Sequence, residues 1–383
     1  MINILVSLEK CGSYSYEEVK SAVKNSFNNL GGIEKYINKG ENILLKSNLV
    51  MRKLPQEAAT THPAVIRALA EILLDYGANV IIGDSPGGPF NEVLLKSIYR
   101  HTGMEEAAAK SGASLSLDTS SSVVEYPDGV RLKKLTITNM VLNADKVISV
   151  GKLKSHSMTR MTGAVKNMFG AVPGTTKAEY HFSCQDSESF AQCLIDICRF
   201  VNPVLSFIDA VTGMEGNGPT AGTPRDIGLI MSSDNPFELD LAASKIINAQ
   251  ASEIPVLKYA FQRGLCPKSA ESLTFAGEKL SDYVIEDFAI PENRSLHFLG
   301  RKPPKVLVNF FNLHVYPRPV FTQLCIGCGI CAENCPAKII SIKNHTASAD
   351  LKKCIRCYCC QELCPQKAVD IEKPFILKIM SKL

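Results

Sequence analysis

The chain reads Cys325-x2-Cys328-x2-Cys331-x3-Cys335-Pro336 near its C-terminal end, and it repeats this spacing as Cys354-x2-Cys357-x2-Cys360-x3-Cys364-Pro365. Eight of the 14 cysteines therefore follow one pattern. Three cysteines with two residues between neighbours form a tight loop of thiolates. The proline after the fourth cysteine has a fixed φ and favours a sharp exit from that loop. Gly327 and Gly329 leave room for inorganic sulfur close to the backbone of the first loop.

This spacing is that of the bacterial ferredoxin run, in which the fourth cysteine of each copy ligates the other cluster. A cubane cluster needs thiolates from several directions, and one loop supplies only three of them. The sequence therefore predicts two 4Fe–4S clusters. Cys359 lies outside the pattern, and we expect it to be a thiol that binds no iron. The predicted ligands are Cys325, Cys328, Cys331 and Cys364 for cluster 1, and Cys354, Cys357, Cys360 and Cys335 for cluster 2.

Two other uses of cysteine fit this pattern less well. Structural zinc binds paired Cys-x2-Cys motifs, but it does not call for eight cysteines in two copies that each end in Cys-Pro. Disulfides fit an exported protein, yet the apolar start Ile2–Leu8 is too short for a signal peptide and is followed by Glu9 and Lys10. We therefore expect oxygen-sensitive clusters, an anaerobic protein and a reducing cytoplasmic location.

Length and charge limit the class of protein. A chain of 383 residues is long enough for two or three domains, and a hydrophobic fraction of 45% is that of a protein with an ordinary core. The formal net charge of +4 is too weak to indicate a nucleic-acid-binding domain, although a mildly basic surface suits an acidic redox partner protein. No segment approaches the ~20 apolar residues of a membrane span.

The first 300 residues alternate between short apolar runs and helical periodicity. Strands separated by helices predict an α/β fold, with a mostly parallel sheet flanked by helices. In such sheets ligands bind beyond the carboxyl ends of the strands. The predicted strands are Ile2–Leu8, Asn42–Lys46, Ala78–Gly83, Lys146–Val150, Val204–Ile208 and Ile227–Met231, and the predicted helices are Tyr16–Leu30, Pro63–Tyr76 and Pro236–Asn248.

Four polar or Gly-rich segments follow predicted strands. Gly-rich loops of this kind can hold an anion with backbone N–H groups, although none matches the dinucleotide-binding fingerprint and tight turns are the alternative for each. From these segments we expect Asn48, Asp84 and Asn217 to contact a cofactor or substrate. The segments are Lys46–Leu49, Gly83–Gly88, Gly151–His181 and Asp209–Pro219.

The third of these segments is the richest in chemistry. Lysines gather where anions bind, and a desolvated lysine can act as a nucleophile or base. Histidine titrates near neutral pH and ligates metals. Solvated loop residues are the alternative. We expect Lys152 and Lys154 to bind an anion, and His156 or His181 to carry out acid–base chemistry. Lys166, with Asn167 beside it, is expected to contact the ligand covalently or electrostatically. The segment Thr162–Phe169 is predicted to begin a helix, and the start of a helix favours an anion.

These segments resemble an uncharacterised family, known as domain of unknown function 362. The resemblance rests on Lys46–Leu49, Gly83–Gly87, Lys152–His156, Gly163–Gly170 and Glu215–Pro219. It covers roughly residues 1–300. Members often carry a C-terminal ferredoxin domain, as this chain does. The resemblance implies a fold and names no reaction.

A second resemblance is to lactate racemase and its relatives, which bind a nickel-pincer nucleotide covalently through a lysine in a Gly-Gly-Ala-Lys-like segment. His156, Lys166 and His181 have a similar order and spacing to the histidines and lysine of those enzymes. This chain departs from the pattern, with Gly163-Ala-Val-Lys166 in place of the glycine pair and Asn167 after the lysine. The resemblance implies an additional organic or metal cofactor.

Composition changes mark the domain boundaries. Residues 1–300 are predicted to form the α/β domain with its ligand cleft. The basic, proline-rich residues 301–321 are predicted to be a linker that lies as a strap against one domain. Residues 322–372 are predicted to form the small ferredoxin-like α+β domain, and residues 373–383 a packed tail.

Three functions follow as hypotheses. The first is a ferredoxin-dependent oxidoreductase, in which the clusters relay electrons to a small anionic substrate or cofactor in the cleft. The second is a non-catalytic electron carrier or maturation factor that recognises a protein partner. The third is a racemase-like enzyme with a bound nickel cofactor. Substitution of Lys166 separates them, because the first and third lose activity while the second keeps its electron transfer.

Overall fold

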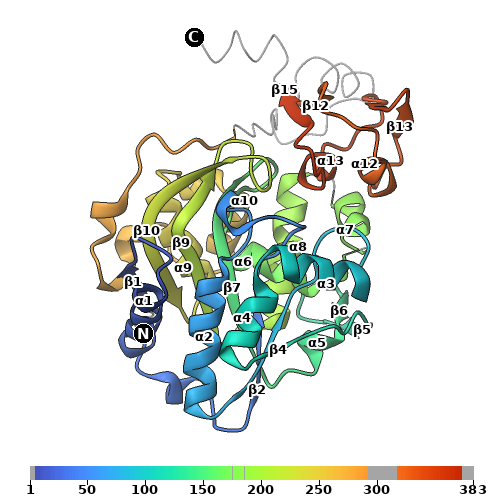
Figure 1. Ribbon diagram of the computed structural model, residues 1–383. Helices are drawn as coiled ribbons and strands as arrows, with labels where there is room; N and C mark the ends of the chain where they lie inside the picture. Colours follow the sequence, from blue (N-terminus) through green and yellow to red (C-terminus); the bar gives the residue numbers. More distant parts are fainter. Residues whose placement is uncertain (1–4, 175, 185, 292–316, 373–383) are drawn as a thin grey trace.

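The computed structural model describes residues 5–174, 176–184, 186–291 and 317–372. Within these ranges a large α/β domain is followed by a small domain, which lies over one end of the large domain's sheet (Figure 1). Part of the predicted strand Ile2–Leu8, much of the predicted linker 301–321 and all of the predicted tail 373–383 lie outside the described residues.

The large domain is built on one mixed sheet, and most of its strand pairs are parallel. Its order is β11-β1-β10-β9-β7-β2-β3-β4, with β8 paired to β7, and β10 runs antiparallel to both neighbours. The predicted fold class is confirmed. The strands are β1 (Leu5–Lys10), β2 (Asn42–Lys46), β3 (Asn79–Gly83), β4 (Ser114–Leu115), β7 (Lys146–His156), β8 (Arg160–Thr162), β9 (Leu205–Glu215), β10 (Thr223–Ser233) and β11 (Thr274–Gly277); β5 (Ser121–Glu125) and β6 (Lys134–Thr138) form a separate ribbon.

Helices cover both faces of the sheet (Figure 1). In strand β2 successive side chains point to opposite faces, so Ile43 and Leu45 pack into one core while Leu44 packs into the other. The first core includes α1 (Tyr16–Asn29), α2 (Pro63–Tyr76), α3 (Glu92–His101) and α4 (Met104–Ser111). The second includes α5 (Asn139–Leu142), α6 (Ala164–Asn167), α7 (Lys177–Ser183), α8 (Ser187–Val201), α9 (Pro236–Ile246) and α10 (Pro255–Gln262).

Local signals explain where the predicted helices begin and end. Helix α2 has Pro63 at its first position, where no N–H is needed, and Gly77 ends it with a φ of 106°. Helix α9 begins after Asn235, whose side-chain oxygen accepts hydrogen bonds from the N–H groups of Phe237 and Glu238.

Two strands run further than the sequence predicted. The segment after Val150 was expected to be a loop, but β7 continues to His156; Asp209 was also expected in a loop, but β9 continues to Glu215. Both extensions keep a partner for their backbone groups, because β8 turns back along β7 and β10 pairs antiparallel with β9 up to Glu215. The paired extensions project toward the small domain.

The small domain contains two short antiparallel strand pairs and two single-turn helices. Strand β12 (Arg318–Phe321) pairs with β15 (Val369–Glu372), so the last residues of the predicted linker belong to the fold of this domain. Strand β13 (Ile340–Lys343) pairs with β14 (Thr346–Ala349). Helices α12 (Ile330–Glu333) and α13 (Cys359–Glu362) follow the two cysteine loops and face the large domain (Figure 1). This is the ferredoxin-like α+β arrangement that the sequence predicted.

Candidate functional site

Two cavities in the small domain are each lined by four cysteines. The two sets are the two groups of four that the crossed arrangement of ligands predicts. Thiolates are the ligands of 4Fe–4S clusters, so the donor sets fit two such clusters. The first cavity, of about 340 Å³, is lined by Cys325, Cys328, Cys331 and Cys364, and the second, of about 370 Å³, by Cys335, Cys354, Cys357 and Cys360.

The backbone of the two loops follows the sequence repeat. Gly327 and Gly329 of the first loop have φ angles of 66° and 83°, and Arg356 and Tyr358 hold the equivalent positions of the second loop with φ of 59°. A Cβ atom at Gly327 would lie 2.7 Å from the backbone of His345, so glycine is required there by space as well as by φ.

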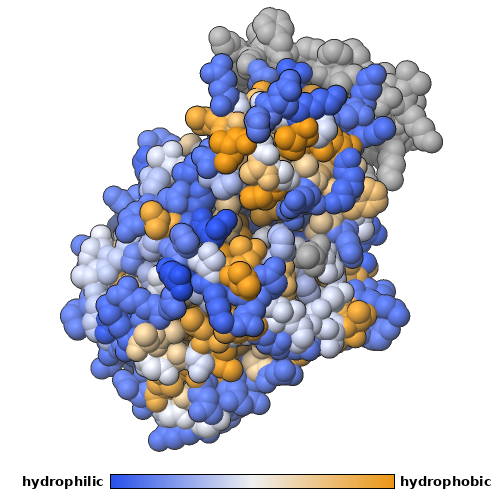
Figure 2. Space-filling model, turned by 45° about the vertical axis from the view of Figure 1, so that its right-hand side comes forward, coloured by the Kyte–Doolittle hydropathy of each residue, from blue (hydrophilic) through white to orange (hydrophobic). Residues whose placement is uncertain are grey.

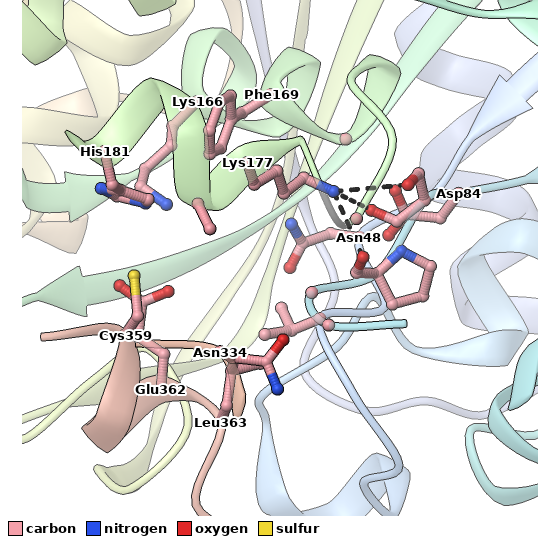
Figure 3. A pocket seen from close by; sticks show the side chains of 18 of the residues that line it. Asn48, Asp84, Lys166, Phe169, Lys177, His181, Asn334, Cys359, Glu362 and Leu363 are labelled. Carbon is pink, nitrogen blue, oxygen red and sulfur yellow. Dashed lines mark hydrogen bonds between the residues drawn. The ribbon is translucent and has the colours of Figure 1, made fainter. Parts of the chain in front are cut away.

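A larger cavity lies between the two domains. One wall comes from the ends of β2 and β3 and from the segment between β8 and α7, and the other comes from α12 and α13 of the small domain. Figure 3 shows Lys166 and His181 facing Cys359 and Glu362 across this space. The cavity holds about 700 Å³ of space between atoms, part of which is open to solvent. Of the residues predicted from the sequence, it brings together Asn48, Asp84, Lys166, Asn167 and His181.

Lys166 is positioned by a buried carboxylate behind its helix. The side chain of Asp240 accepts hydrogen bonds from the N–H groups of Ala164 (2.6 Å) and Val165 (3.1 Å) at the start of α6. The predicted anion at this helix start is therefore a residue of the chain itself. Burial lowers the pKa of the Lys166 amine, which forms no hydrogen bond or ion pair within the described part of the chain.

His181 lies on α7 between two aromatic rings. Its ring stacks on Phe190 at 4.4 Å between centroids and meets the edge of Phe169 at 5.7 Å. Its side chain is 4% exposed, and Nδ1 has no hydrogen-bond partner among the described residues. Burial lowers the pKa of His181 to about 4, so the ring is neutral at neutral pH.

His156 lies behind the cavity and contacts the small domain. Its Nδ1 accepts hydrogen bonds from the N–H groups of Met158 (3.0 Å) and Thr159 (3.2 Å), so the proton of the neutral ring is on Nε2. Nε2 lies 2.9 Å from Oε1 of Glu362, although its N–H is not aligned for a hydrogen bond. Burial lowers the pKa of His156 to about 4. Burial would raise the pKa of Glu362, but His156 and Lys166 outweigh it and lower that pKa.

The opposite end of the cavity is a hydrogen-bonded polar network. Lys46 forms a buried ion pair with Asp84, whose other oxygen accepts a hydrogen bond from the N–H of Leu49 at 2.7 Å. Asn48 donates to the side-chain oxygen of Asn167 at 3.2 Å. These residues fix the loops after β2 and β3 against α6, and they give the cavity a polar floor.

Lys177 also faces this end, and sequence reasoning missed it. Its amine donates to the carbonyl and hydroxyl oxygens of Ser85 and to the carbonyl oxygen of Pro86, as Figure 3 shows. Burial lowers the pKa of Lys177 to about 7. Its place in the first turn of α7, four residues before His181, was the available signal.

Besides His156, three other predicted residues do not line this cavity. Lys152 forms a buried ion pair with Asp209 at 2.9 Å and contacts the hydroxyl of Tyr14 at 2.7 Å. Lys154 donates to Asn48 (2.7 Å) and to the carbonyl oxygen of Ala59 (2.6 Å). Asn217 is exposed. The two lysines predicted to bind an anion therefore already have partners within the protein.

The small domain contributes residues that no local pattern indicated. Glu362, Leu363, Asn334 and Cys359 all line the cavity. Cys359 is buried there, as a packed thiol beside Cys360, which the sequence predicts to be a cluster ligand. The only sequence signal was their position next to cysteines of the repeated pattern.

An α/β domain joined to a small domain with two cysteine-lined cavities defines an iron–sulfur protein. The chain belongs to the family described as Domain of unknown function (DUF362), whose model matches residues 43–245. Residues 324–368 match a 4Fe-4S dicluster domain, in agreement with the predicted cluster binding.

A curated relative spans most of this chain. A thylakoid-associated protein of Synechocystis sp. is 31% identical over 333 residues, which are 85% of this chain and 98% of that protein. Within the ranges that the structure describes, no helix combines the length and apolarity needed to cross a bilayer.

Two solved structures resemble the chain at low sequence identity. The lactate racemase apoprotein from Thermoanaerobacterium thermosaccharolyticum has a TM-score of 0.39 and 13% identity, over 66% of this chain and 58% of that one. A protein from Thermotoga maritima has a TM-score of 0.34 and 12% identity, over 65% of this chain and 59% of that one. The chain therefore spans about three fifths of each of these structures.

Proposed function

We propose that this protein is a ferredoxin-dependent oxidoreductase that passes electrons from two 4Fe–4S clusters to a small molecule in the interdomain cavity. One observation carries the proposal: helix α13 holds the proposed cluster ligand Cys360 and also forms the cavity wall through Cys359 and Glu362. A molecule in the cavity would therefore lie beside a cluster ligand. Iron–sulfur clusters supply single electrons, over potentials from about −700 to +450 mV.

The two proposed clusters differ in their access to solvent. Cys328 of the first set is exposed, and Leu324 and Ile326 beside it are 63% and 57% exposed. Three of the second set, Cys335, Cys357 and Cys360, are buried. Figure 2 shows apolar side chains gathered on the part of the molecule where the small domain lies. We propose that a redox partner protein delivers electrons to cluster 1 and that they leave from cluster 2.

The large domain would bind and orient the electron acceptor. Asn48 and Asn167 give the site a polar floor, Phe169 offers an aromatic surface, and Lys166 and His181 offer polar groups without partners among the described residues. We place this chemistry in a reducing compartment such as the cytoplasm, because 4Fe–4S clusters and free thiols persist there. Thylakoid association is a property named for the Synechocystis relative and is not carried over to this chain.

The experiment fills the cavity without changing its charge. Ala178 lines the cavity, so Ala178→Phe should block it, whereas Ala109→Phe places the same ring on an exposed position of α4. Both variants are purified without oxygen, and their clusters are counted by native mass spectrometry and electron paramagnetic resonance. Reduced protein is then mixed with the low-molecular-mass fraction of an anaerobic cell extract, and reoxidation is followed by absorbance.

We expect equal cluster content in both variants and reoxidation at least roughly tenfold slower in Ala178→Phe, since a misplaced acceptor loses about 1.4 kcal/mol or more of barrier lowering. Equal reoxidation rates in the two variants would contradict the proposal and favour an electron carrier that acts only on protein partners.

A further inference from the structure

We infer that the cavity binds a small oxyanion, a carboxylate or a phosphate, between the amines of Lys166 and Lys177. This inference deepens the proposed function by naming the chemical class of the acceptor, and it rests on the interdomain cavity being the ligand site. It also moves the anion-binding role from Lys152 and Lys154 to two lysines that line the cavity.

Five lysines of this domain differ in their partners. Lys46 and Lys152 each contact a carboxylate, of Asp84 and of Asp209, and Lys154 is held by two neutral oxygens at 2.6 and 2.7 Å. Lys177 donates to oxygens of Ser85 and Pro86, whereas Lys166 forms no hydrogen bond or ion pair within the described residues, and both half-buried lysines line the cavity. An amine partly removed from water favours a compensating anion, so Lys166, with Lys177 in the same cavity, indicates a ligand with negative charge.

Two carboxylates also line the cavity. Asp84 is held by Lys46 and by the N–H of Leu49, and Glu362 lies 2.9 Å from Nε2 of the neutral His156 without an aligned hydrogen bond. Glu362 raises the pKa of Lys166 through its charge, but burial of that amine has the larger, opposite effect. Within the described residues neither carboxylate forms an ion pair with Lys166 or Lys177, so a further negative group can bind beside these amines.

A second, independent group points into the same space. Nδ1 of His181 is buried without a hydrogen-bond partner among the described residues, and the side chain faces the cavity beside Lys166 (Figure 3). A buried polar atom without a partner costs free energy, and a ligand oxygen that accepts a hydrogen bond from Nδ1–H of the neutral ring removes that cost. Lys166 and His181 therefore present an amine and an imidazole beside each other, and Lys177 adds a second amine toward the Ser85–Pro86 end of the same cavity, which suits the several oxygens of a carboxylate or phosphate.

Binding should be linked to a proton on Lys177. The charged groups that act on this amine are Asp84, Lys46, Lys166 and Glu362. Burial lowers the pKa of Lys177 to about 7, and a bound anion raises it again, so the complex takes up protons near neutral pH. Affinity should therefore fall as the pH rises above about 7.

The test measures anion binding to the cluster-loaded protein by isothermal titration calorimetry, with acetate and inorganic phosphate as the probes. The variants are Lys166→Met and Lys177→Met, which keep the apolar stem of the side chain. Lys177→Arg restores the charge. Lys110→Met is the matched control, because Lys110 forms an exposed ion pair with Glu106 on α4.

We expect acetate or phosphate to bind wild type and Lys110→Met alike, and both methionine variants to lose roughly tenfold or more in affinity. Lys177→Arg should recover most of that loss, which a mere folding defect would not explain. From about pH 6 to pH 8, wild-type affinity should decrease, and Lys177→Met should lose most of that dependence. Tighter acetate binding would indicate a carboxylic acid as the natural ligand, and tighter phosphate binding a phosphorylated one.

Absence of binding by both probes, or equal binding by wild type and the methionine variants, would overturn the inference. The reoxidation result with Ala178→Phe is measured separately. If Ala178→Phe is reoxidised slowly but anion binding does not depend on the two lysines, the proposed function stands. Only the inference that the ligand is an oxyanion is then rejected.

Discussion

His156 shows how backbone geometry sets the chemistry of one side chain. Because two backbone N–H groups point at its Nδ1, this ring cannot accept a second proton without losing both hydrogen bonds. His181 is neutral for a different reason, since it lies between aromatic rings in a buried place. Both residues therefore act as neutral groups that orient other groups, and neither carries a fixed charge at neutral pH.

These two histidines should make the fold acid-sensitive. Their pKa is about 4 in the folded protein and near 6.5 when unfolded, so the unfolded state binds more protons between those values. Stability should fall as pH drops from about 6.5 to about 4, by an upper limit on the order of 3 kcal/mol per histidine. Urea unfolding followed by circular dichroism measures this. His181→Gln should flatten the dependence, and His101→Gln, on an exposed position of α3, should not. An unchanged slope in His181→Gln would contradict the assignment.

At the scale of secondary-structure elements, a very short helix needs hydrogen-bond partners from other elements for its terminal backbone groups. Helix α6 has only four residues, so its start depends on the Asp240 carboxylate of α9. Burial raises the pKa of Asp240 to about 7, against the opposing effect of the two N–H groups. Gly163, before this helix, has no space for a side chain, since a Cβ there would lie 2.1 Å from Asp240. The position of Lys166 is therefore set by a residue on another helix.

Asp240→Ala should lower the free energy of unfolding by about 1–3 kcal/mol, because two buried N–H groups lose their acceptor. Asp240→Asn keeps one acceptor oxygen and should lose less. Denaturant unfolding gives the stability, and acetate or phosphate titration reports the position of Lys166. Asp75→Ala, on the exposed side of α2, serves as the surface control and should change stability by less than about 0.5 kcal/mol. Equal stability of the Ala and Asn variants would argue against the capping role.

The two glycines of the first cysteine loop form a matched pair. Both have positive φ, but a Cβ at Gly327 meets the backbone of His345 at 2.7 Å, while at Gly329 the nearest atom, on Glu333, is 3.9 Å away. Gly327→Ala should therefore lose a cluster, and Gly329→Ala should keep both with a modest loss of stability. Iron content and native mass spectrometry distinguish the two. Equal cluster loss would show that φ alone, and not the contact with His345, limits this loop.

For the whole molecule, the cavity exists because the two domains touch. Thr220 donates to the carbonyl oxygen of Glu362 at 2.9 Å, Ser157 donates to Gln361 at 2.9 Å, and Lys367 pairs with Glu57 at 3.2 Å. The small domain has a small apolar core of its own around Cys331, Ala347, Cys360 and Val369. Its proposed cluster ligands are thus half of that core, and metal binding should contribute to its folding.

Removal of iron by a chelator should therefore loosen the small domain and open the cavity. Hydrogen exchange should speed up across residues 318–372 and in the facing loop Asp84–Gly88, while β7 and β9 in the centre of the sheet stay protected. Mass spectrometry of peptides before and after chelation measures this. Unchanged exchange in the small domain would show that its packing does not depend on the clusters.

Local features of this fold can be read from the order of residues alone. Repeated cysteine spacing indicated the ferredoxin-like domain and the grouping of its thiols, and apolar runs bounded by Pro63, Gly77 and Asn235 predicted strands and helices of the sheet. These signals are readable because turns, helix ends and ligand loops depend on residues a few positions apart. The loops after β2 and β3 and the lysine of α6 were also expected at one sheet edge, since parallel strands end there together.

Which polar residues face the cavity depends on how distant segments pack together. No local sequence feature distinguishes Lys152 from Lys166, but Lys152 forms an ion pair with Asp209 on the neighbouring strand, whereas Lys166 faces the cavity. The ends of β7 and β9 were misjudged because pairing with β8 and β10 extends them. Glu362 reaches His156 from the far end of the chain. Such contacts depend on how separate segments pack, and no local spacing records them.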